Sequence, residues 1–393
     1  MGVVIVGASL SGLRAADALA RSGFDGAITL VGAEKHLPYN RPPLSKEALV
    51  EGSDLETILL RSSAKSGAYE LRIDTRAVAA DLDRGVLELS DGGDLAFDAL
   101  VVATGLRSRE LEIPKPAHGV VCLRGYDDLL RLRSELAGVA DIAIIGGGFI
   151  GCELAASLTS LGYRVTVIAP EKVPMLRPLG NQLGAAIQRH HEDKGVQFAL
   201  SRLPIEILGT DRPNGVLCDD GTFVEAQLVI EAVGSRCNVE WLQGNGLDLS
   251  DGVLCNEKLQ VVGHEFVYAT GDIARFPNLV FDEVPRRVEH WEIAVASGRY
   301  AGKVLGEALQ GKDASPAFAP MPAFWSDQFD LRIQSYGMPG LVQDDPSIRL
   351  LEGSLDGEVA IGYFRGEVMV GVVMLGMAQS HKTYRQILLD TLS

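Results

Sequence analysis

The sequence predicts an α/β protein built from two similar strand–loop–helix units and a smaller α+β domain toward the C-terminus. Two stretches support this fold class. Residues 3–12, VVIVGASLSG, and residues 141–153, DIAIIGGGFIGCE, each begin as a buried apolar strand and stop in a glycine-rich loop. Each loop leads into a helix and then a second apolar strand, at 27–31 in the first unit and 164–168 in the second. This repeat indicates two parallel-sheet domains of the same kind.

The two glycine loops predict two dinucleotide sites. Free N–H groups and the dipole at a helix start favour an anion, and pyrophosphate is the anion that such loops bind. In the first loop Gly7 makes the turn and Gly12 allows close helix packing, while Ser9 replaces the middle glycine of G-x-G-x-x-G and offers a helix cap. The second loop completes the pattern with Gly146, Gly148 and Gly151. Two dinucleotides in one chain most simply serve hydride transfer from a nicotinamide to a flavin.

Composition limits the class of protein. At 393 residues, with 47% apolar side chains, the chain is long enough for two or three domains with their own cores. Its net charge of −16 argues against nucleic acid as the main partner. No run of 18 apolar residues predicts a membrane span, and the first strand begins directly at the N-terminus. We therefore expect a cytoplasmic protein without a signal peptide.

The cysteines argue against thiol redox chemistry. There are five, without C-x-x-C or C-x-x-x-x-C spacing: Cys122, Cys152, Cys218, Cys237 and Cys255. This pattern predicts reduced, mostly buried thiols and excludes the redox-active disulfide of the disulfide-reductase flavoproteins. No residues have zinc or iron–sulfur ligand spacing, so we expect no metal site.

A carboxylate follows the second strand of the first unit. Glu34 lies 22 residues after Gly12, at about the distance where an acidic side chain accepts hydrogen bonds from an adenosine ribose. Asp25 and Glu47 compete for this role, but they fall before the strand and after the next loop. Glu34 is therefore the favoured candidate.

The next loop, HLPYNRPPLSK over 36–46, is held extended by its prolines. A loop after the second strand of a dinucleotide fold lies near the cofactor. Arg41 and Lys46 are therefore candidates for the pyrophosphate or the flavin edge. The alternative is that both are solvated surface cations.

Both units contain an alternating insertion that ends in a strand and a glycine. Residues 70–100 resemble a small antiparallel insertion, which leads into ALVVATG at 99–105. Residues 197–233 repeat the pattern and lead into LVIEAVG at 228–234. A strand that closes on glycine can bring main chain against a ligand where a side chain would obstruct it.

Two later segments return to the first domain. FVYATGD ends on Asp272, which either caps a helix or accepts a hydrogen bond from a flavin ribityl hydroxyl. RRVEHW opens a helix at 286–291, where Trp291 is either a core residue or a cofactor contact. From Pro320 the chain is rich in aromatic residues and short strands, with a last helix over 380–392. This small α+β domain covers a cofactor face, forms a dimer or docks a partner.

The chain resembles the FAD-dependent, NAD(P)H-oxidising ferredoxin reductases of bacterial oxygenase systems, the putidaredoxin reductase and rubredoxin reductase type. The resemblance covers essentially the whole length and rests on GASLSG, PYNRPPLSK, ATG, GGGFIG with Glu153, YATGD, RRVEHW and FWSDQFD. It implies a glutathione-reductase-like fold with two Rossmann-like domains. The expected boundaries are 1–115 and 239–319 for a discontinuous FAD-binding domain, 116–238 for an NAD(P)H-binding domain, and 320–393 for a C-terminal α+β interface domain.

The resemblance also implies the cofactor contacts. Those to FAD are Gly7, Ser9, Ser11, Gly12, Glu34, Arg41, Lys46, Ala79, Ala103, Thr104, Gly105, Asp272, Glu289, His290, Trp291 and Trp325. Those to NAD(P)H are Gly146, Gly148, Phe149, Ile150, Gly151, Glu153, Glu171 and Gly234. Within these sets the resemblance puts Glu289, His290 and Trp291 at the pyrimidine end of the flavin, and Glu153 close to the nicotinamide.

The choice of nicotinamide coenzyme depends on the end of the second strand in the second unit. Ala169 stands where NADH-preferring relatives usually have a glutamate. Glu171, two positions later, is a candidate for the ribose hydroxyls, whereas Lys172 or Arg177 could accept a 2′-phosphate. We expect NADH, with NADPH as the alternative.

The implied reaction is hydride transfer from C4 of NAD(P)H to flavin N5, followed by single-electron transfer to a [2Fe–2S] ferredoxin. That ferredoxin would serve a haem-thiolate monooxygenase or a Rieske dioxygenase. The flavin carries the chemistry, so no catalytic side chain is expected. An acidic ferredoxin requires local cations on this acidic chain. The candidates, unless they are merely solvated charges, are Arg286, Arg287, Lys382 and Arg385.

Two other functions are possible on this fold. NADH oxidases, peroxidases and CoA-disulfide reductases keep a cysteine near the flavin, but the corresponding segment here is Tyr39-Asn40-Arg41-Pro42. A flavin-binding signalling or assembly protein of the apoptosis-inducing-factor type would be reduced slowly by NAD(P)H. The oligomeric state, monomer or homodimer, stays open.

Overall fold

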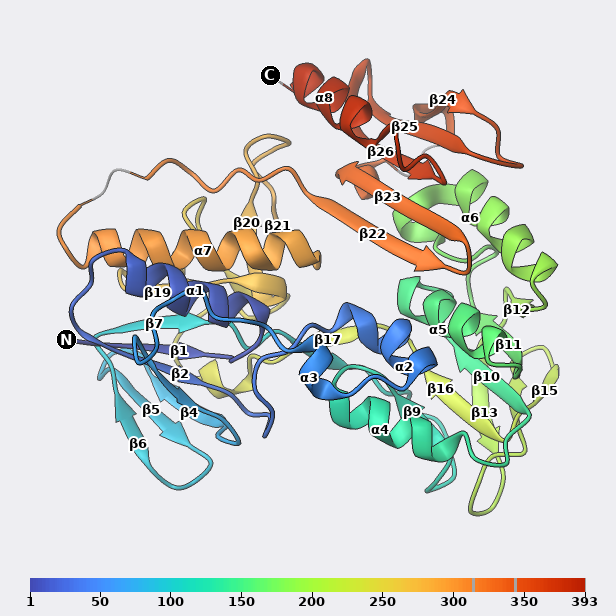
Figure 1. Ribbon diagram of the computed structural model, residues 1–393, viewed down its shortest axis with the longest axis horizontal. Helices are drawn as coiled ribbons and strands as arrows, with labels where there is room; N and C mark the ends of the chain where they lie inside the picture. The colour runs from blue at the N-terminus through green and yellow to red at the C-terminus, as the bar shows by residue number, and fades with distance from the viewer. Residues whose placement is uncertain (313–314, 343–344, 393) are drawn as a thin grey trace. The chain divides into compact units, whose positions relative to one another are not determined.

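The computed structural model describes residues 1–312, 315–342 and 345–392 (Figure 1). Its contacts divide the chain into two compact units. The first unit comprises residues 1–40, 58–107 and 236–323, and the second comprises residues 41–57, 108–235 and 324–393. Two of the five points at which the chain passes from one unit to the other lie in β8 (Leu106–Ser108) and β17 (Ser235–Cys237), which pair with each other. Each unit contains a parallel sheet, so the predicted α/β fold is confirmed.

The first unit is built on a five-stranded parallel sheet with the order β19-β7-β1-β2-β3. Its strands are β1 (Gly2–Val6), β2 (Ala27–Val31), β3 (Glu70–Arg72), β7 (Ala99–Val102) and β19 (Val267–Ala269). β1 is apolar and almost wholly buried, as expected for a central parallel strand. Val6 lies opposite both Val31 and Val102. Three strands therefore end together where the first glycine loop begins.

Two helices of this unit, α1 (Leu10–Arg21) and α7 (Trp291–Ala308), lie side by side (Figure 1). Glycines spaced four apart on α7 permit a close approach. A Cβ atom at Gly298 would lie 2.3 Å from the carbonyl oxygen of Ser11, and one at Gly302 would lie 2.2 Å from that of Ala15. The helices therefore pack backbone to backbone, which holds the start of α1 in place.

Smaller sheets complete the first unit. One consists of β4 (Ala77–Asp81), β5 (Val86–Leu89) and β6 (Asp94–Ala96), and another of β18 (Val253–Leu254), β20 (Ala274–Pro277) and β21 (Pro285–Arg287). Short 3-10 helices are η2 (Glu240–Leu242) and η3 (Gly271–Ile273). The predicted antiparallel insertion is confirmed for β4–β6. Residues 70–72 differ, because they pair parallel with β2 and extend the main sheet.

The second unit repeats the parallel sheet in the order β12-β11-β10-β16-β9. Its strands are β9 (Val120–Cys122), β10 (Asp141–Ile145), β11 (Arg164–Ala169), β12 (Gln197–Leu200) and β16 (Leu228–Glu231). Its helices include α4 (Tyr126–Glu135), α5 (Phe149–Ser160) and α6 (Leu176–Asp193). The insertion forms β13 (Pro204–Leu208), β14 (Gly215–Cys218) and β15 (Phe223–Glu225). In both units the strand before the glycine loop lies between the second strand and the glycine-ended strand.

The C-terminal segment of the second unit forms a sheet with the order β22-β23-β26-β25-β24. Its strands are β22 (Ala323–Gln328), β23 (Leu331–Gly337), β24 (Ile348–Gly353), β25 (Val359–Arg365) and β26 (Val368–Leu375). The short helices η4 (Pro339–Leu341) and η5 (Asp345–Ser347) precede α8 (His381–Leu392), which packs on β26. The second unit also holds η1 (Pro42–Ser45) and α2 (Glu47–Glu51), with α3 (Leu55–Ile58) at its boundary. The predicted last helix begins one residue later than expected.

Among the described residues, no helix is both long and apolar enough to cross a membrane.

Candidate functional site

The first glycine loop is fixed by two backbone contacts. Gly7 has φ +116°, and a Cβ atom there would lie 2.1 Å from the carbonyl oxygen of Ala103. A Cβ atom at Gly12 would lie 1.9 Å from the carbonyl oxygen of Gly7. Real Cβ atoms do not approach backbone oxygens so closely, so glycine is required at both positions. The Ala103-Thr104-Gly105 segment that follows β7 therefore touches this loop.

The second glycine loop repeats this geometry. Gly146 has φ +118°, and its Cβ atom would lie 2.2 Å from the carbonyl oxygen of Ala232. A Cβ atom at Gly151 would lie 2.0 Å from the carbonyl oxygen of Gly146. Gly234, which follows β16, also has a positive φ of +100°. The two loops therefore match in their own geometry and also in the neighbouring segment that each one contacts, the residues after β7 in the first unit and those after β16 in the second.

Ser9 departs from the glycine pattern without backbone strain. It is the N-cap of α1 with φ −107° and ψ −161°, and Gly148 is the N-cap of α5 with φ −81° and ψ −173°. Both backbones are extended, a conformation open to any residue. Within the described part of the chain, the Ser9 side chain makes no capping hydrogen bond. The serine therefore does not supply the cap that its sequence position suggested.

A buried group of hydroxyls supports the start of α1. The hydroxyls of Ser11 and Thr270 lie 2.7 Å apart, and Thr270 donates to Ser297 at 2.9 Å. The Gly271 amide donates to the Ser297 hydroxyl at 3.0 Å. These bonds join α1, the end of β19 and α7. The role of Ser297 could not be predicted from the sequence, because no sequence pattern distinguishes it from any other serine within a helix.

Other predicted FAD residues in the first unit have protein partners. Tyr39 donates its hydroxyl hydrogen bond to Glu34 at 2.5 Å, and Thr104 donates to the carbonyl of Asn238 at 2.7 Å. Ala79 pairs with Glu88 in the insertion sheet. Gly105 has φ +60°, in the left-handed region that favours glycine. Of these contacts, the hydrogen bond from Tyr39 orients the Glu34 carboxylate.

The RRVEHW segment joins several strands of the first unit. Arg287 contacts Asp251 and Glu289, each at 2.7 Å, and donates to the carbonyl of Asp272, which lies in η3, at 3.2 Å. Burial opposes the charge of Arg287, but the hydrogen bond to Asp251 and the charge of Glu289 raise its pKa above the usual value. Arg286 pairs with Asp282 at 2.5 Å. The charges of both arginines are therefore balanced locally.

Two aromatic residues complete this segment. Trp291 begins α7 and donates its indole N–H to the side-chain oxygen of Asn40 at 2.8 Å. This bond fixes the indole of Trp291 next to the end of the proline-rich loop. Burial lowers the pKa of His290 to about 4, so its imidazole is neutral at pH 7.

A buried ion pair lies in the second unit. Glu153, in α5 two residues after Gly151, is only 4% exposed. Its carboxylate accepts hydrogen bonds from the hydroxyls of Ser45 and Ser326, both at 2.6 Å, and contacts Lys46 Nζ at 2.8 Å. A buried carboxylate needs such donors, because removing its charge from water costs several kcal/mol. Neither serine was predicted from the sequence to belong to the site, because they lie 108 and 173 residues from Glu153.

The other predicted residues of the second unit lie on separate elements. Arg41 donates to the carbonyl of Arg124 at 2.7 Å. Phe149 and Ile150 begin α5, and the Phe149 ring contacts Phe324 at a centroid distance of 4.9 Å. Glu171 contacts Arg177 at 3.3 Å. Trp325 lies on β22, beside Ser326, and Lys382 and Arg385 are exposed on α8. Arg41, Lys46 and Trp325 belong to this unit, whereas the other predicted FAD residues belong to the first.

The cysteines are free thiols in the part of the chain that the structure describes. Burial raises the pKa of Cys152 and of Cys255 to about 12. It also raises the pKa values of Cys122, Cys218 and Cys237. A thiolate is the reactive form of cysteine, so none of these residues has the environment of a redox-active thiol.

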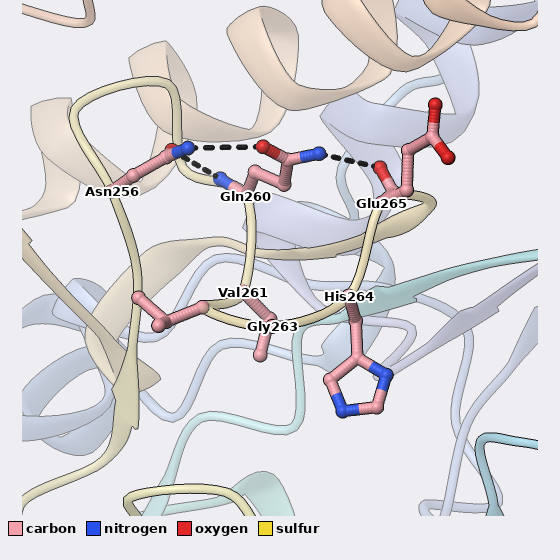
Figure 2. Close-up of a pocket in the computed structure, with 7 residues that line it drawn as sticks. Asn256, Gln260, Val261, Gly263, His264 and Glu265 are labelled. Atoms are coloured by element: carbon pink, nitrogen blue, oxygen red, sulfur yellow. Dashed lines mark hydrogen bonds between the residues drawn. The ribbon is translucent and has the colours of Figure 1, made fainter.

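A surface hollow is lined by none of the predicted site residues. It is formed by the turn between Asn256 and Glu265 (Figure 2). Asn256 donates to the side-chain oxygen of Gln260 at 2.9 Å, and Gln260 donates to the carbonyl of Glu265 at 2.6 Å. The side chains of Asn256 and Gln260 therefore stabilise the turn itself.

Comparison with known proteins identifies relatives over the whole chain. The family model for pyridine nucleotide-disulphide oxidoreductases matches residues 1–298, and the reductase C-terminal model matches residues 323–392. The ferredoxin–NAD(+) reductase component of the anthranilate 1,2-dioxygenase system of Burkholderia cepacia is 34% identical over 88% of this chain and 85% of its own length. Rhodocoxin reductase of Rhodococcus erythropolis is 32% identical over 99% and 89%. The crystal structure of the covalent putidaredoxin reductase–putidaredoxin complex matches with a TM-score of 0.91 and 30% identity, covering 99% of this chain and 93% of that one.

The loop geometry predicts that, of two glycine-to-serine substitutions in the same loop, one lowers stability and the other leaves it unchanged. Gly151→Ser puts a Cβ atom 2.0 Å from a backbone oxygen, and we expect it to lower stability by about 2 kcal/mol. Gly148→Ser recreates the arrangement of Ser9 and meets no atom within 4 Å, so we expect the wild-type Tm. Calorimetry of the two variants checks this. Equal Tm values would contradict the proposed backbone contact.

Proposed function

Since this chain belongs to the pyridine nucleotide-disulphide oxidoreductase family, we propose that it passes electrons from NADH through FAD to a [2Fe–2S] ferredoxin that serves an oxygenase. The ion pair between Lys46 and Glu153 carries the proposal. The family resemblance implies that Lys46 lies beside the flavin and its phosphates and Glu153 close to the nicotinamide, and the reacting ends of these two cofactors must meet. A direct contact of 2.8 Å between these side chains is what that assignment requires.

The residues of both loops fit a dinucleotide. Each loop brings main chain against a neighbouring strand and leaves the first N–H groups of its helix without partners inside the helix. The first turns of α1 and α5 contain no acidic residue that would oppose a pyrophosphate. We propose that the first loop and Glu34 hold FAD, and that the second loop and Glu171 hold NADH.

When bound, FAD accepts a hydride from the nicotinamide and releases electrons singly, which links a two-electron donor to a one-electron iron–sulfur acceptor. The role of the protein's own residues is to bind the two cofactors and to orient them. The Glu153 carboxylate accepts hydrogen bonds from two serines and contacts Lys46, so it holds Lys46 in place. Lys46 also donates to the carbonyl of Pro42 at 3.2 Å, which fixes the ammonium group from a second side. No side chain needs to exchange a proton with the substrate.

The names of several relatives support a ferredoxin as the partner and NADH as the coenzyme. They are components of dioxygenase systems from Burkholderia cepacia and Pseudomonas putida, and their names specify NAD(+). The match of residues 323–392 to the reductase C-terminal model supports a separate C-terminal domain beginning near residue 320. We further propose that the protein works in the cytoplasm.

The first test is anaerobic stopped-flow mixing of the purified flavoprotein with NADH and, separately, with NADPH. We expect NADH to bleach the flavin within the time of one turnover, and a [2Fe–2S] ferredoxin then to be reduced catalytically. Fast bleaching without ferredoxin turnover would favour an oxidase on the same fold. Bleaching too slow for turnover would favour a flavin-binding signalling protein.

Coenzyme choice provides a second prediction. Glu171→Ala removes a carboxylate that repels a 2′-phosphate and releases Arg177 from its ion pair. We expect the ratio of kcat/KM for NADH to that for NADPH to fall by about tenfold, equivalent to 1.4 kcal/mol. Asp193→Ala is the matched control, because it removes an exposed carboxylate of the same unit that is assigned to no ligand. An unchanged ratio in Glu171→Ala would contradict the assignment.

The balanced charges of Arg286 and Arg287 make the exposed cations of α8 the better candidates for ferredoxin docking. Lys382→Glu combined with Arg385→Glu should raise the KM for an acidic ferredoxin by about tenfold at low salt, because complementary charge aids association. Reduction of ferricyanide should be unchanged. The control pair Lys65→Glu and Arg131→Glu changes the net charge equally at other exposed sites. Equal effects of both pairs would leave no role for α8 in docking.

A further inference from the structure

A chain of buried polar side chains leads away from Glu153 in the second unit. Ser326 Oγ contacts Glu153 Oε1 at 2.6 Å, Gln328 Nε2 contacts Ser326 Oγ at 3.0 Å, and His191 Nε2 contacts Gln328 Oε1 at 2.8 Å. Ser326, Gln328 and His191 are each at most 1% exposed. β22 supplies the first two residues and the last turn of α6 supplies the histidine. This series of hydrogen bonds therefore links α5, α6 and β22, which are separate segments of the sequence.

The direction of every hydrogen bond follows from the charge of Glu153. An ionised carboxylate only accepts, so Ser326 must donate its one proton to it. Ser326 then accepts from Gln328, which turns the amide N–H₂ toward the serine and the amide oxygen toward His191. His191 must therefore donate from Nε2. All three donors point toward the carboxylate.

The position of His191 is not explained by packing. Its side chain is wholly buried, with Phe198 and Phe329 at ring-centroid distances of 6.0 and 5.2 Å. Among the described residues its Nδ1 has no hydrogen-bond partner. An apolar side chain would fill this space without leaving a buried acceptor unsatisfied. Burial lowers the pKa of His191 to about 4, which agrees with the neutral tautomer that the chain requires.

We propose that His191 is a positioning residue that, through Gln328 and Ser326, orients the Glu153 carboxylate and so holds Lys46 where hydride transfer needs it. This role rests on the proposed function. The other groups near the carboxylate are the Ser45 hydroxyl and the neutral Cys152 thiol. Without the histidine donor, the amide oxygen of Gln328 is left buried and unsatisfied. The amide then reorients and the donor from Ser326 to Glu153 is lost.

The tautomer is tested by NMR of the flavin-loaded protein labelled with 15N-histidine, with the His191 signals identified by their absence in His191→Gln. We expect a neutral ring protonated at Nε2 and unchanged between pH 5 and pH 8. A ring protonated at Nδ1, or one that titrates near the ordinary histidine pKa, would overturn the proposed chain.

The positioning role is tested by stopped-flow flavin reduction at several NADH concentrations. In His191→Leu we expect the limiting rate to fall by about tenfold, because small displacements at a reacting centre slow hydride transfer, while the Kd for NADH stays unchanged. His191→Gln keeps a donor near the Nε2 position and should recover most of the rate. His190→Gln is the matched control, since His190 lies next in sequence and pairs with Asp330 at the surface.

The outcomes separate this proposal from the proposed function. If NADH does not reduce the wild-type flavin, the proposed function fails. If it does, and His191→Leu has the same limiting rate as His190→Gln, the positioning role fails. Should His191→Leu not fold, Ser326→Ala removes the last donor of the chain with little change in volume. It is then expected to show the same loss of rate at an unchanged Kd.

Discussion

Both units depend on one constraint, the approach of a glycine loop to the backbone of a neighbouring strand. At Gly7 and at Gly146 the space for a Cβ atom is taken by a carbonyl oxygen, of Ala103 and of Ala232 respectively. This contact sets the turn from strand to helix, and the turn sets where the free N–H groups of the helix start. The rest of each sheet holds these two backbone segments together. The same solution occurs twice, with the same order of four strands, β7-β1-β2-β3 in the first unit and β16-β10-β11-β12 in the second.

The second organising interaction is the burial of one charge. Glu153 stands in the second turn of α5, where water is almost excluded, and it is stable there because Ser45, Lys46 and Ser326 surround it. These donors come from a loop early in the chain and from a strand near its end. The contact pattern places both segments in the second unit, although the sequence separates them from it. A single carboxylate thus connects the three segments that make up this unit.

The secondary structure around the loops was predictable because its signals are local. β2 occupies the predicted residues 27–31, and the last helix begins within one residue of its expected start. Residues 70–72 were misassigned because a three-residue strand has too little pattern to show its pairing partner. The ion pairs of Arg286 and Arg287 also could not be predicted from the sequence. Two adjacent arginines give the same sequence pattern whether or not carboxylates neutralise their charges.

The sequence by itself determined the fold class, the two glycine loops, the family resemblance and most candidate ligands. Glycine position and apolar periodicity are properties of neighbouring residues, so they can be read along the chain. The tertiary structure decided that Lys46 and Glu153 meet, that Ser9 is free of strain, and that Ser326, Gln328 and His191 point their donors toward one carboxylate. Apart from the bond between Gln328 and Ser326, which lie two positions apart, these contacts join residues more than a hundred positions apart, and the lack of strain at Ser9 depends on its backbone angles. Only the folded chain brings such groups within hydrogen-bond distance and fixes which atom donates.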